Sequence, residues 1–204
     1  VCNHLSHQHP IFQEAQHNPN SPYRAWFTFD DSPIGYRTFF GVRSMPQINL
    51  AHPDARAWML DIARYWLREF DVDGYRLDYA SGPGPGFWAE FRAACRAVKP
   101  DCFCFGEIVD QPSAWLPYLG QLDGCLDFLL SEALRKTYAY RTWTEADFER
   151  FVARHEAYFA DEGDFIRPTF IDNHDMDRFL FVAGGDKAAL RRAAEAQMRL
   201  PGPP

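Results

Sequence analysis

From residue 53 onward the sequence alternates between helical and strand patterns, and this alternation limits the fold more than any other feature. Apolar residues spaced by three and four positions predict a helix from Pro53 to about Phe70. The run that ends at Asp78 is typical of a short strand, and a Gly/Pro-rich turn then leads to a helix that ends before Pro100. Elements in this order predict a parallel sheet, either doubly wound or part of an eight-stranded barrel.

The same alternation continues to the end of the chain. Three more strands are predicted, over 102–108, 124–128 and 165–172. Two more helices are predicted, one that begins near residue 144 and one over 186–199. Thr144 and Asp147 have the spacing of a capping box, which fixes the start of the first of these helices. About four strands fit the pattern, which is half of an eight-stranded barrel.

The first 50 residues lack this order. They show no sustained periodicity and are rich in His, Asn, Pro and aromatic side chains, among them Trp26, Phe39 and Phe40. They therefore predict a long structured loop region, and a loop of that length inside a compact domain is usually functional.

The composition excludes several classes of protein. The 204 residues are 47% hydrophobic and 24% charged, which is typical of a globular chain and not of a disordered one. The formal net charge of −7 argues against nucleic acid or an anionic membrane as the main partner. No apolar run approaches the roughly 18 residues that span a bilayer.

The five cysteines have no paired C-x-x-C spacing. They are Cys2, Cys95, Cys102, Cys104 and Cys125. Because Cys102 and Cys104 alternate along an apolar run, we interpret them as small buried strand residues and not as a metal or redox centre.

Three of the four predicted strands end in carboxylates, at Asp78, at Glu107, and at Asp172 with Asp175. Burying an unpaired carboxylate costs several kcal/mol, so three at the same end of successive strands indicate a site. In parallel barrels the catalytic residues gather at that end. Arg76 lies two residues before Asp78 and therefore on the same face of the strand, where the two side chains would pair.

Paired carboxylates on neighbouring strands suit glycoside hydrolysis. One acid attacks the sugar while the other protonates the leaving oxygen, and a separation of roughly 5 to 5.5 Å gives retention of configuration. His174, beside Asp175, offers a donor for a sugar hydroxyl.

Five segments resemble the conserved regions of the alpha-amylase family (glycoside hydrolase family 13). Gly74-Tyr75-Arg76-Leu77-Asp78 resembles the second region, Gly106-Glu107-Ile108 the third, and 170–175 the fourth. Val1-Cys2-Asn3-His4 is similar to the end of the first region, and Met45-Pro46-Gln47-Ile48-Asn49 to the fifth, in the form found near neopullulanases and cyclomaltodextrinases. The five occur in the family's order across nearly the whole chain.

The resemblance implies an α/β fold, part of a (β/α)8 TIM barrel with a small B domain inserted after strand 3. Residues 1–4 would end barrel strand 3, residues 5–50 would form the B-domain insert, and residues 51–204 would form catalytic-barrel strands 4–7 with their helices. Strands 1, 2 and 8 would be missing, so we expect a partial-length fragment that is inactive by itself.

The resemblance also implies a role for each matching residue. Asp78 would be the nucleophile, Glu107 the general acid and base, and Asp175 the residue that stabilises the transition state. The same subsite would be lined by His4, Arg76 and His174.

The motifs depart from the family at one point. Many α-amylases follow the nucleophile with a Lys-His pair, where this chain has Tyr79-Ala80-Ser81. Asn3 matches a calcium-ligand position in some members and is a weak calcium candidate. We therefore expect no required cofactor and regard calcium as an open alternative.

The leading hypothesis is a retaining glycoside hydrolase that cleaves α-1,4 glucosidic bonds, with α-1,6 bonds as an alternative linkage, in starch-type oligosaccharides or cyclodextrins. One alternative is a transglycosylase or isomerase of the same family, amylosucrase-like or trehalose-forming. Another is a non-catalytic amylase-like binding domain, against which the presence of all three acids counts. A nucleotide-binding domain is disfavoured because the segment 82–86 is too rich in proline to present backbone N–H groups to phosphate. The sequence indicates neither the compartment nor the oligomeric state.

Overall fold

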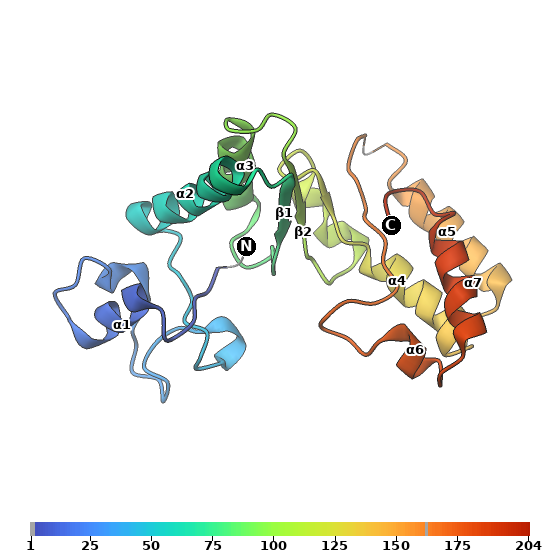
Figure 1. The fold of residues 1–204 in the computed structure, drawn as a ribbon, viewed down its shortest axis with the longest axis horizontal. Coiled ribbons are helices and arrows are strands. Elements are labelled where there is room, and N and C mark those ends of the chain that lie inside the picture. Colours follow the sequence, from blue (N-terminus) through green and yellow to red (C-terminus); the bar gives the residue numbers. More distant parts are fainter. Residues whose placement is uncertain (1–2, 162) are drawn as a thin grey trace. The chain divides into compact units, whose positions relative to one another are not determined.

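The computed structural model describes residues 3–161 and 163–204, and the chain divides into two compact units, residues 1–104 and 105–204. Figure 1 shows the helices and strands of each unit. No helix within the described residues is long and apolar enough to cross a membrane.

The predicted end of a barrel strand at residues 1–4 falls partly on Val1 and Cys2, which lie outside the described residues. His4 forms an isolated antiparallel bridge with Gln47, and the Leu5 N–H donates to the Pro46 carbonyl at 3.0 Å. The first described residues therefore pair with Pro46 and Gln47.

Helix α2, Pro53–Phe70, begins at the predicted proline. Its buried face repeats every four residues, as expected of an amphipathic helix, through Ala55, Met59, Ala63 and Leu67. The buried Tyr75 hydroxyl donates to the Ala63 carbonyl at 2.6 Å, which joins this helix to strand β1, Gly74–Leu77.

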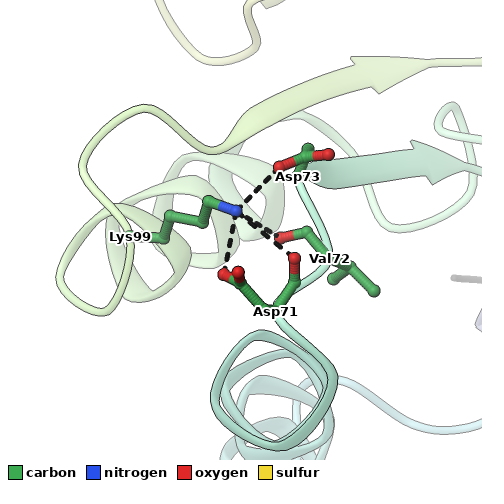
Figure 2. A network of polar contacts seen from close by, with 4 residues as sticks. All are labelled: Asp71, Val72, Asp73 and Lys99. Atoms are coloured by element: carbon green, nitrogen blue, oxygen red, sulfur yellow. Dashed lines mark hydrogen bonds and ion pairs between the residues drawn. The ribbon is translucent and has the colours of Figure 1, made fainter.

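A lysine fixes the link between α2 and β1. Figure 2 shows the Lys99 ammonium between the carboxylates of Asp71 and Asp73, at 3.1 and 2.7 Å, with the Val72 carbonyl at 3.3 Å. The hydrogen bond to Asp73, followed by that to Asp71, raises the pKa of Lys99, and the hydrogen bond from Lys99 lowers the pKa of Asp73. These contacts with Lys99, a residue outside the strands, therefore fix the start of β1.

Helix α3, Pro85–Arg96, follows the Gly/Pro-rich turn, and strand β2, Phe103–Gly106, comes after it. The Phe103 N–H donates to the Asp73 carbonyl at 3.0 Å. A Cβ at Gly74 would lie 2.0 Å from the Phe103 carbonyl oxygen, so only glycine permits this approach of the two backbones.

Residues 5–50 contain a helix that the sequence patterns do not predict. Helix α1, Pro10–His17, has only eight residues, too few for a periodic signal, and the His9 side chain accepts the Ile11 N–H at its start. Its Phe12 packs against Phe27 and Tyr36, with ring centroids 5.0 and 4.8 Å apart. The segment therefore has a small aromatic core of its own. Short 3-10 turns lie at Arg24–Trp26 and Phe39–Gly41.

In the second unit, strand β3, Gly124–Cys125, pairs in parallel with the end of β2, with Phe105 opposite Gly124. The sheet order is β1-β2-β3. These strands are shorter than the predicted ranges, but their places and order agree with the α/β prediction.

The predicted strand over 165–172 is wrong as a regular strand. It makes one isolated parallel bridge, Gly124 with Ile166, and the Asp127 N–H donates to the Pro168 carbonyl at 2.9 Å. Pro168 has no N–H to continue a ladder, so the segment runs beside β3 without forming a regular strand.

The remaining helices pack together in the second unit. They are α4, Phe128–Leu134, continued by a π-helical turn at Arg135–Ala139, then α5, Glu145–Tyr158, α6, Phe179–Val182, and α7, Lys187–Gln197. The capping box of Thr144 and Asp147 is present as predicted, and Asp186 caps α7. The sequence patterns do not predict α4 or α6. Their shared core includes Leu134, Phe148, Phe179 and Ala193.

Candidate active site

The first unit places Arg76 and Asp78 at the end of β1. Strand β1 ends at Leu77 and Asp78 follows directly, so the two charged side chains lie on the same side and form an ion pair. Their side chains are 26% and 28% exposed, which leaves the carboxylate accessible while it stays paired. The spacing in the sequence predicted this contact.

An aromatic cluster, defined as His4, Phe39, Phe40 and Tyr79, lies in the same unit. The His4 ring stacks on Phe39 with centroids 4.5 Å apart, and Tyr79 meets the rings of Phe39 and Phe40 at 5.1 and 5.0 Å. Phe40 is 72% exposed. A large exposed ring supported by other rings is the kind of surface on which a sugar stacks.

Two members of this aromatic cluster have unusual backbones. Phe40 and Tyr79 have φ angles of +46° and +44°, in the left-handed region that costs a side-chain-bearing residue about 1 kcal/mol or more. Such backbones concentrate at functional sites. Sequence reasoning treated Tyr79 only as a departure from the family, although an aromatic residue directly after a candidate nucleophile was the signal that could have identified it.

In the second unit Glu107 directly follows β2, which ends at Gly106. The residue is half-buried, and the next residue, Ile108, is fully buried. The buried Trp115 indole donates to the Ile108 carbonyl at 3.1 Å. This bond anchors the chain immediately after the candidate acid and base, so the position of Glu107 depends on a packed tryptophan.

The segment that carries His174 and Asp175 is tied down at both ends. Arg135 donates to the carbonyls of Ile171 at 3.4 Å and Asp177 at 3.0 Å. Asp172 accepts from the Arg178 guanidinium and from the Phe179 N–H, both at 2.6 Å. Asp172, which the sequence grouped with the strand-end acids, therefore has a structural role at the start of α6.

Between these anchors His174 and Asp175 face solvent. The His174 Nε2 lies 3.2 Å from a carboxylate oxygen of Asp175, and both side chains are more than half exposed. The Asp175 N–H donates to the Asn173 side chain at 2.9 Å, which shapes the turn. Both polar side chains are thus exposed, while the backbone of their segment is fixed by the hydrogen bonds of Arg135 and Asp172.

The six candidate residues form two sets of three. One set, His4, Arg76 and Asp78, belongs to the first unit, and the other, Glu107, His174 and Asp175, to the second. Each acid of the pair Asp78 and Glu107 follows the last residue of its strand.

A cavity of about 920 Å³ lies in the second unit. Its lining includes Val109 and Asp110, which come shortly after Glu107 in the sequence, and Met176, which follows Asp175. The rest of the lining combines aromatic rings with charged and polar groups, including Phe128, Phe151, Tyr140, Tyr158, Glu132, Arg135, Arg154 and His155. Its volume suits a small molecule of a few sugar rings.

His155, which lines this cavity, pairs with the buried Asp127. The His155 Nε2 lies 2.7 Å from an Asp127 carboxylate oxygen, and the two side chains are 2% and 0% exposed. The other oxygen of Asp127 accepts the Leu130 N–H at 2.9 Å, which caps α4. The pair therefore holds α5 against the start of α4.

The calcium candidate Asn3 does not have a suitable donor set around it. Asn3 is 3% exposed, and its buried Oδ1 has no hydrogen-bond partner. It lines a cavity of about 320 Å³, but the charged groups of the described lining are Arg37 and Arg56, and Gln47 offers only an amide. Calcium sites are built from several oxygens with carboxylates among them, so the residues present do not fit calcium.

Comparison with known proteins agrees with these motifs. The family model described as the alpha-amylase catalytic domain matches residues 1–204. The chain belongs to the alpha-amylase family. This confirms the resemblance carried by the five sequence segments, and it supports the predicted partial barrel fold.

Several members of this family are similar over nearly the whole chain. The chain is 40% identical to Alpha-amylase 2 of Dictyoglomus thermophilum over 98% of its length, and 34% identical to a cyclomaltodextrinase of Geobacillus thermopakistaniensis over 100%. It covers 35% and 36% of those proteins, so it spans about a third of the curated relatives' length.

A solved structure has the same fold. The structure is the cyclic alpha-maltosyl-(1→6)-maltose hydrolase of Arthrobacter globiformis in complex with cyclic alpha-maltosyl-(1→6)-maltose. The identity is 27% and the TM-score 0.87, covering 99% of this chain and 47% of that one.

Proposed function

We propose that the protein containing this chain is a retaining glycoside hydrolase that acts on α-1,4 glucosidic bonds of starch-type oligosaccharides or cyclodextrins. The observation that carries the proposal is Asp78, paired with Arg76 directly after one strand, together with Glu107 directly after the next. Two carboxyl groups on successive strands, one of them paired with an arginine and partly exposed, are the groups that retaining hydrolysis needs.

Asp78 attacks the anomeric carbon and forms a covalent glycosyl-enzyme, while Glu107 gives its proton to the leaving glycosidic oxygen. Glu107 then takes a proton from water, which attacks the same carbon and releases Asp78. Arg76 orients the Asp78 carboxylate for its attack on the sugar. His4, His174 and Asp175 hold hydroxyls of the reacting sugar.

The substrate class rests on the sugar-binding surfaces and on the relatives. The exposed Phe40 ring and Tyr79 offer stacking faces in the first unit, and the cavity of the second unit mixes rings with hydrogen-bonding groups. Names of relatives such as cyclomaltodextrinase and neopullulanase support an α-glucan, with α-1,6 bonds as a further linkage.

The barrel correspondence is part of the proposal. Strands β1, β2 and β3 and the segment 165–172 take the places of barrel strands 4–7, and residues 5–50 take the place of the B domain. The acids then stand at the carboxyl end of the strands, where barrel enzymes carry out their chemistry. The reaction is assigned to the carboxylates, and no step is assigned to calcium.

The test uses the complete natural reading frame that contains these residues. Maltooligosaccharides, cyclodextrins and pullulan are supplied, and NMR follows the anomeric configuration of the first product. We expect the α-anomer first, and activity lower by about 10⁴-fold or more in Asp78→Asn, because that variant cannot form the covalent intermediate. Asp61→Asn, a change at an exposed carboxylate of α2, is the matched control.

Two outcomes would refute the proposal. One is the β-anomer as the first product, and the other is near-normal turnover in Asp78→Asn with a folded protein. Products longer than the substrate would instead assign the protein to the transglycosylases of the family.

A further inference from the structure

Three cysteines of the first unit come together in its core. Cys95 lies in the last turn of α3, Cys102 just before β2, and Cys104 within β2. Their Sγ atoms all lie within 4.8 Å of one another, and the Cys102 and Cys104 sulfurs are 4.0 Å apart. Each residue is at most 1% exposed.

The secondary structure explains this meeting. Residues two apart in an extended chain point to the same face, so Cys102 and Cys104 both face α3, whose last turn supplies Cys95. Tyr75 of the adjacent strand is close enough that the three thiols add to the effect of burial in raising the pKa of its phenol. The three sulfurs are therefore directed inward from two rigid elements.

The geometry is not that of a disulfide. A disulfide bond is about 2.05 Å long, roughly half of the observed separation, and strand residues two apart have Cα atoms about 6.6 Å apart, near the outer limit for a bridge. Cys95, Cys102, Cys104 and Cys125 are all free of disulfides.

Three sulfurs this close together can be drawn onto one shared atom. A trivalent atom with a lone pair binds three thiolates as a pyramid, with sulfurs closer together than the 4.0 Å between Cys102 and Cys104, so binding pulls the three side chains inward. Soft thiolate ligands select soft ions. In an apolar core, the ion that leaves no net charge is favoured because burying a charge is costly. A divalent ion with three thiolates leaves one negative charge, whereas a trivalent ion leaves none.

Cys102 and Cys104 are buried strand residues as predicted, but they are not restricted to packing: we propose that Cys95, Cys102 and Cys104 form a buried three-thiol site for trivalent arsenic, taken up as arsenous acid. Three S–H bonds and three As–OH bonds break, three As–S bonds form, and three molecules of water leave. Arsenic stays in the trivalent state, so no oxidant or reductant takes part. Occupation joins the end of α3 to β2 and stabilises the first unit.

Because the sulfurs are buried, arsenous acid reaches them only when the core opens locally. The binding rate is therefore expected to rise with low concentrations of urea, which increase the open population, until global unfolding begins. Surface thiols would show no such rise.

The experiment titrates the complete protein with arsenite and follows the ultraviolet absorption of arsenic–thiolate bonds and the melting temperature. We expect one arsenic per chain and a raised melting temperature. Affinity should fall at least tenfold in each of Cys95→Ala and Cys104→Ala. Cys125→Ala, which removes a buried thiol of β3 outside the cluster, should bind normally.

X-ray absorption of the arsenic-loaded wild type decides the point without relying on the variants. Three sulfur neighbours support the site, and fewer than three overturn it. Tighter binding of Cd²⁺ or Zn²⁺ than of arsenite would overturn the choice of a neutral complex. Unchanged affinity in folded Cys95→Ala would also contradict the assignment.

Discussion

The two units hold their acidic residues in different ways. In the first, Asp78 is fixed by a direct side-chain pair with Arg76, its neighbour along the strand. In the second, the segment that carries Asp175 is fixed through the backbone by Arg135 and Asp172. A directly paired acid depends on one local residue, while a loop-borne acid depends on the packing of distant helices. Substitutions in each unit can test this difference.

The largest effect is expected in the second unit, at the buried pair of His155 and Asp127. His155→Leu leaves the Asp127 carboxylate buried without its partner, which costs about 3 to 5 kcal/mol of unfolding free energy. Urea denaturation monitored by tryptophan fluorescence measures this loss of unfolding free energy. His155→Gln retains a hydrogen-bond donor, so its unfolding free energy should fall much less. Equal losses in both variants would show that ring packing, and not the ion pair, sustains α5.

In the first unit the expected effect falls on activity. Arg76→Met removes the guanidinium beside Asp78 and should lower kcat by about 10² to 10³-fold, the usual loss of a positioned charged donor. Stability should change little because both side chains are partly exposed. The matched change in the second unit is Arg178→Met, which leaves Asp172 bonded to the Phe179 N–H. In that variant kcat should fall by less than about tenfold. A larger fall would show that activity depends on a side-chain pair in the second unit as it does in the first.

Arg135→Met tests the backbone anchoring of the loop. It removes the charged donor of the Ile171 and Asp177 carbonyls from a residue only 5% exposed, so we expect a loss of about 2 kcal/mol of unfolding free energy. KM should rise and kcat should fall, because the segment that carries His174 and Asp175 is no longer anchored by Arg135. Normal kinetics with reduced stability would separate the loop from catalysis.

Phe40→Ala tests the aromatic cluster with a smaller effect. The ring is largely exposed, so stability should stay unchanged or rise slightly with relief of its left-handed backbone. Substrate stacking on one ring is worth about 1 kcal/mol, which corresponds to a rise in KM of about fivefold. Phe29→Ala, in the small aromatic core of residues 5–50, is the contrasting change, since it should alter stability before KM.

The sequence predicted the elements whose signal is local. Pro53 and the four-residue repeat of α2, and the capping box of Thr144, are read directly from residue types and spacing, and both agree with the structure. The contact of Arg76 with Asp78 followed from the alternation of a strand. The same reasoning failed at 165–172, because one proline interrupts a ladder whose apolar pattern is otherwise that of a strand.

The parts of the candidate site that could not be predicted depend on contacts between distant residues. Arg135 meets Ile171 and Asp177 across 36 and 42 positions of sequence, and no periodicity signals such a contact. The pair of His155 and Asp127 is separated by 28 positions, and each residue alone reads as an ordinary polar residue of a helix or helix cap. Their roles follow only from packing.

The smallest effect is expected at Lys99, which fixes β1 from the outside. Lys99→Met removes hydrogen bonds to Asp71 and Asp73, both of them exposed and screened by solvent, so the loss of stability should be slight. Asp73 has a lowered pKa, so its contribution is present above the ordinary value of 3.8 and is lost as the pH falls. Lys99 has a raised pKa, so its contribution is present below 10.5 and is lost as the pH rises through the folded value.

The difference in urea midpoint between wild type and Lys99→Met should therefore be constant between those two pH values and shrink outside them. It should also shrink with added salt, because screening weakens exposed ion pairs. If the difference in urea midpoint changes with neither pH nor salt, the lysine acts through its hydrogen bonds to the Val72 and Asp71 carbonyls. In that case β1 in the first unit, like the Asp175 segment in the second, would be held mainly through its backbone.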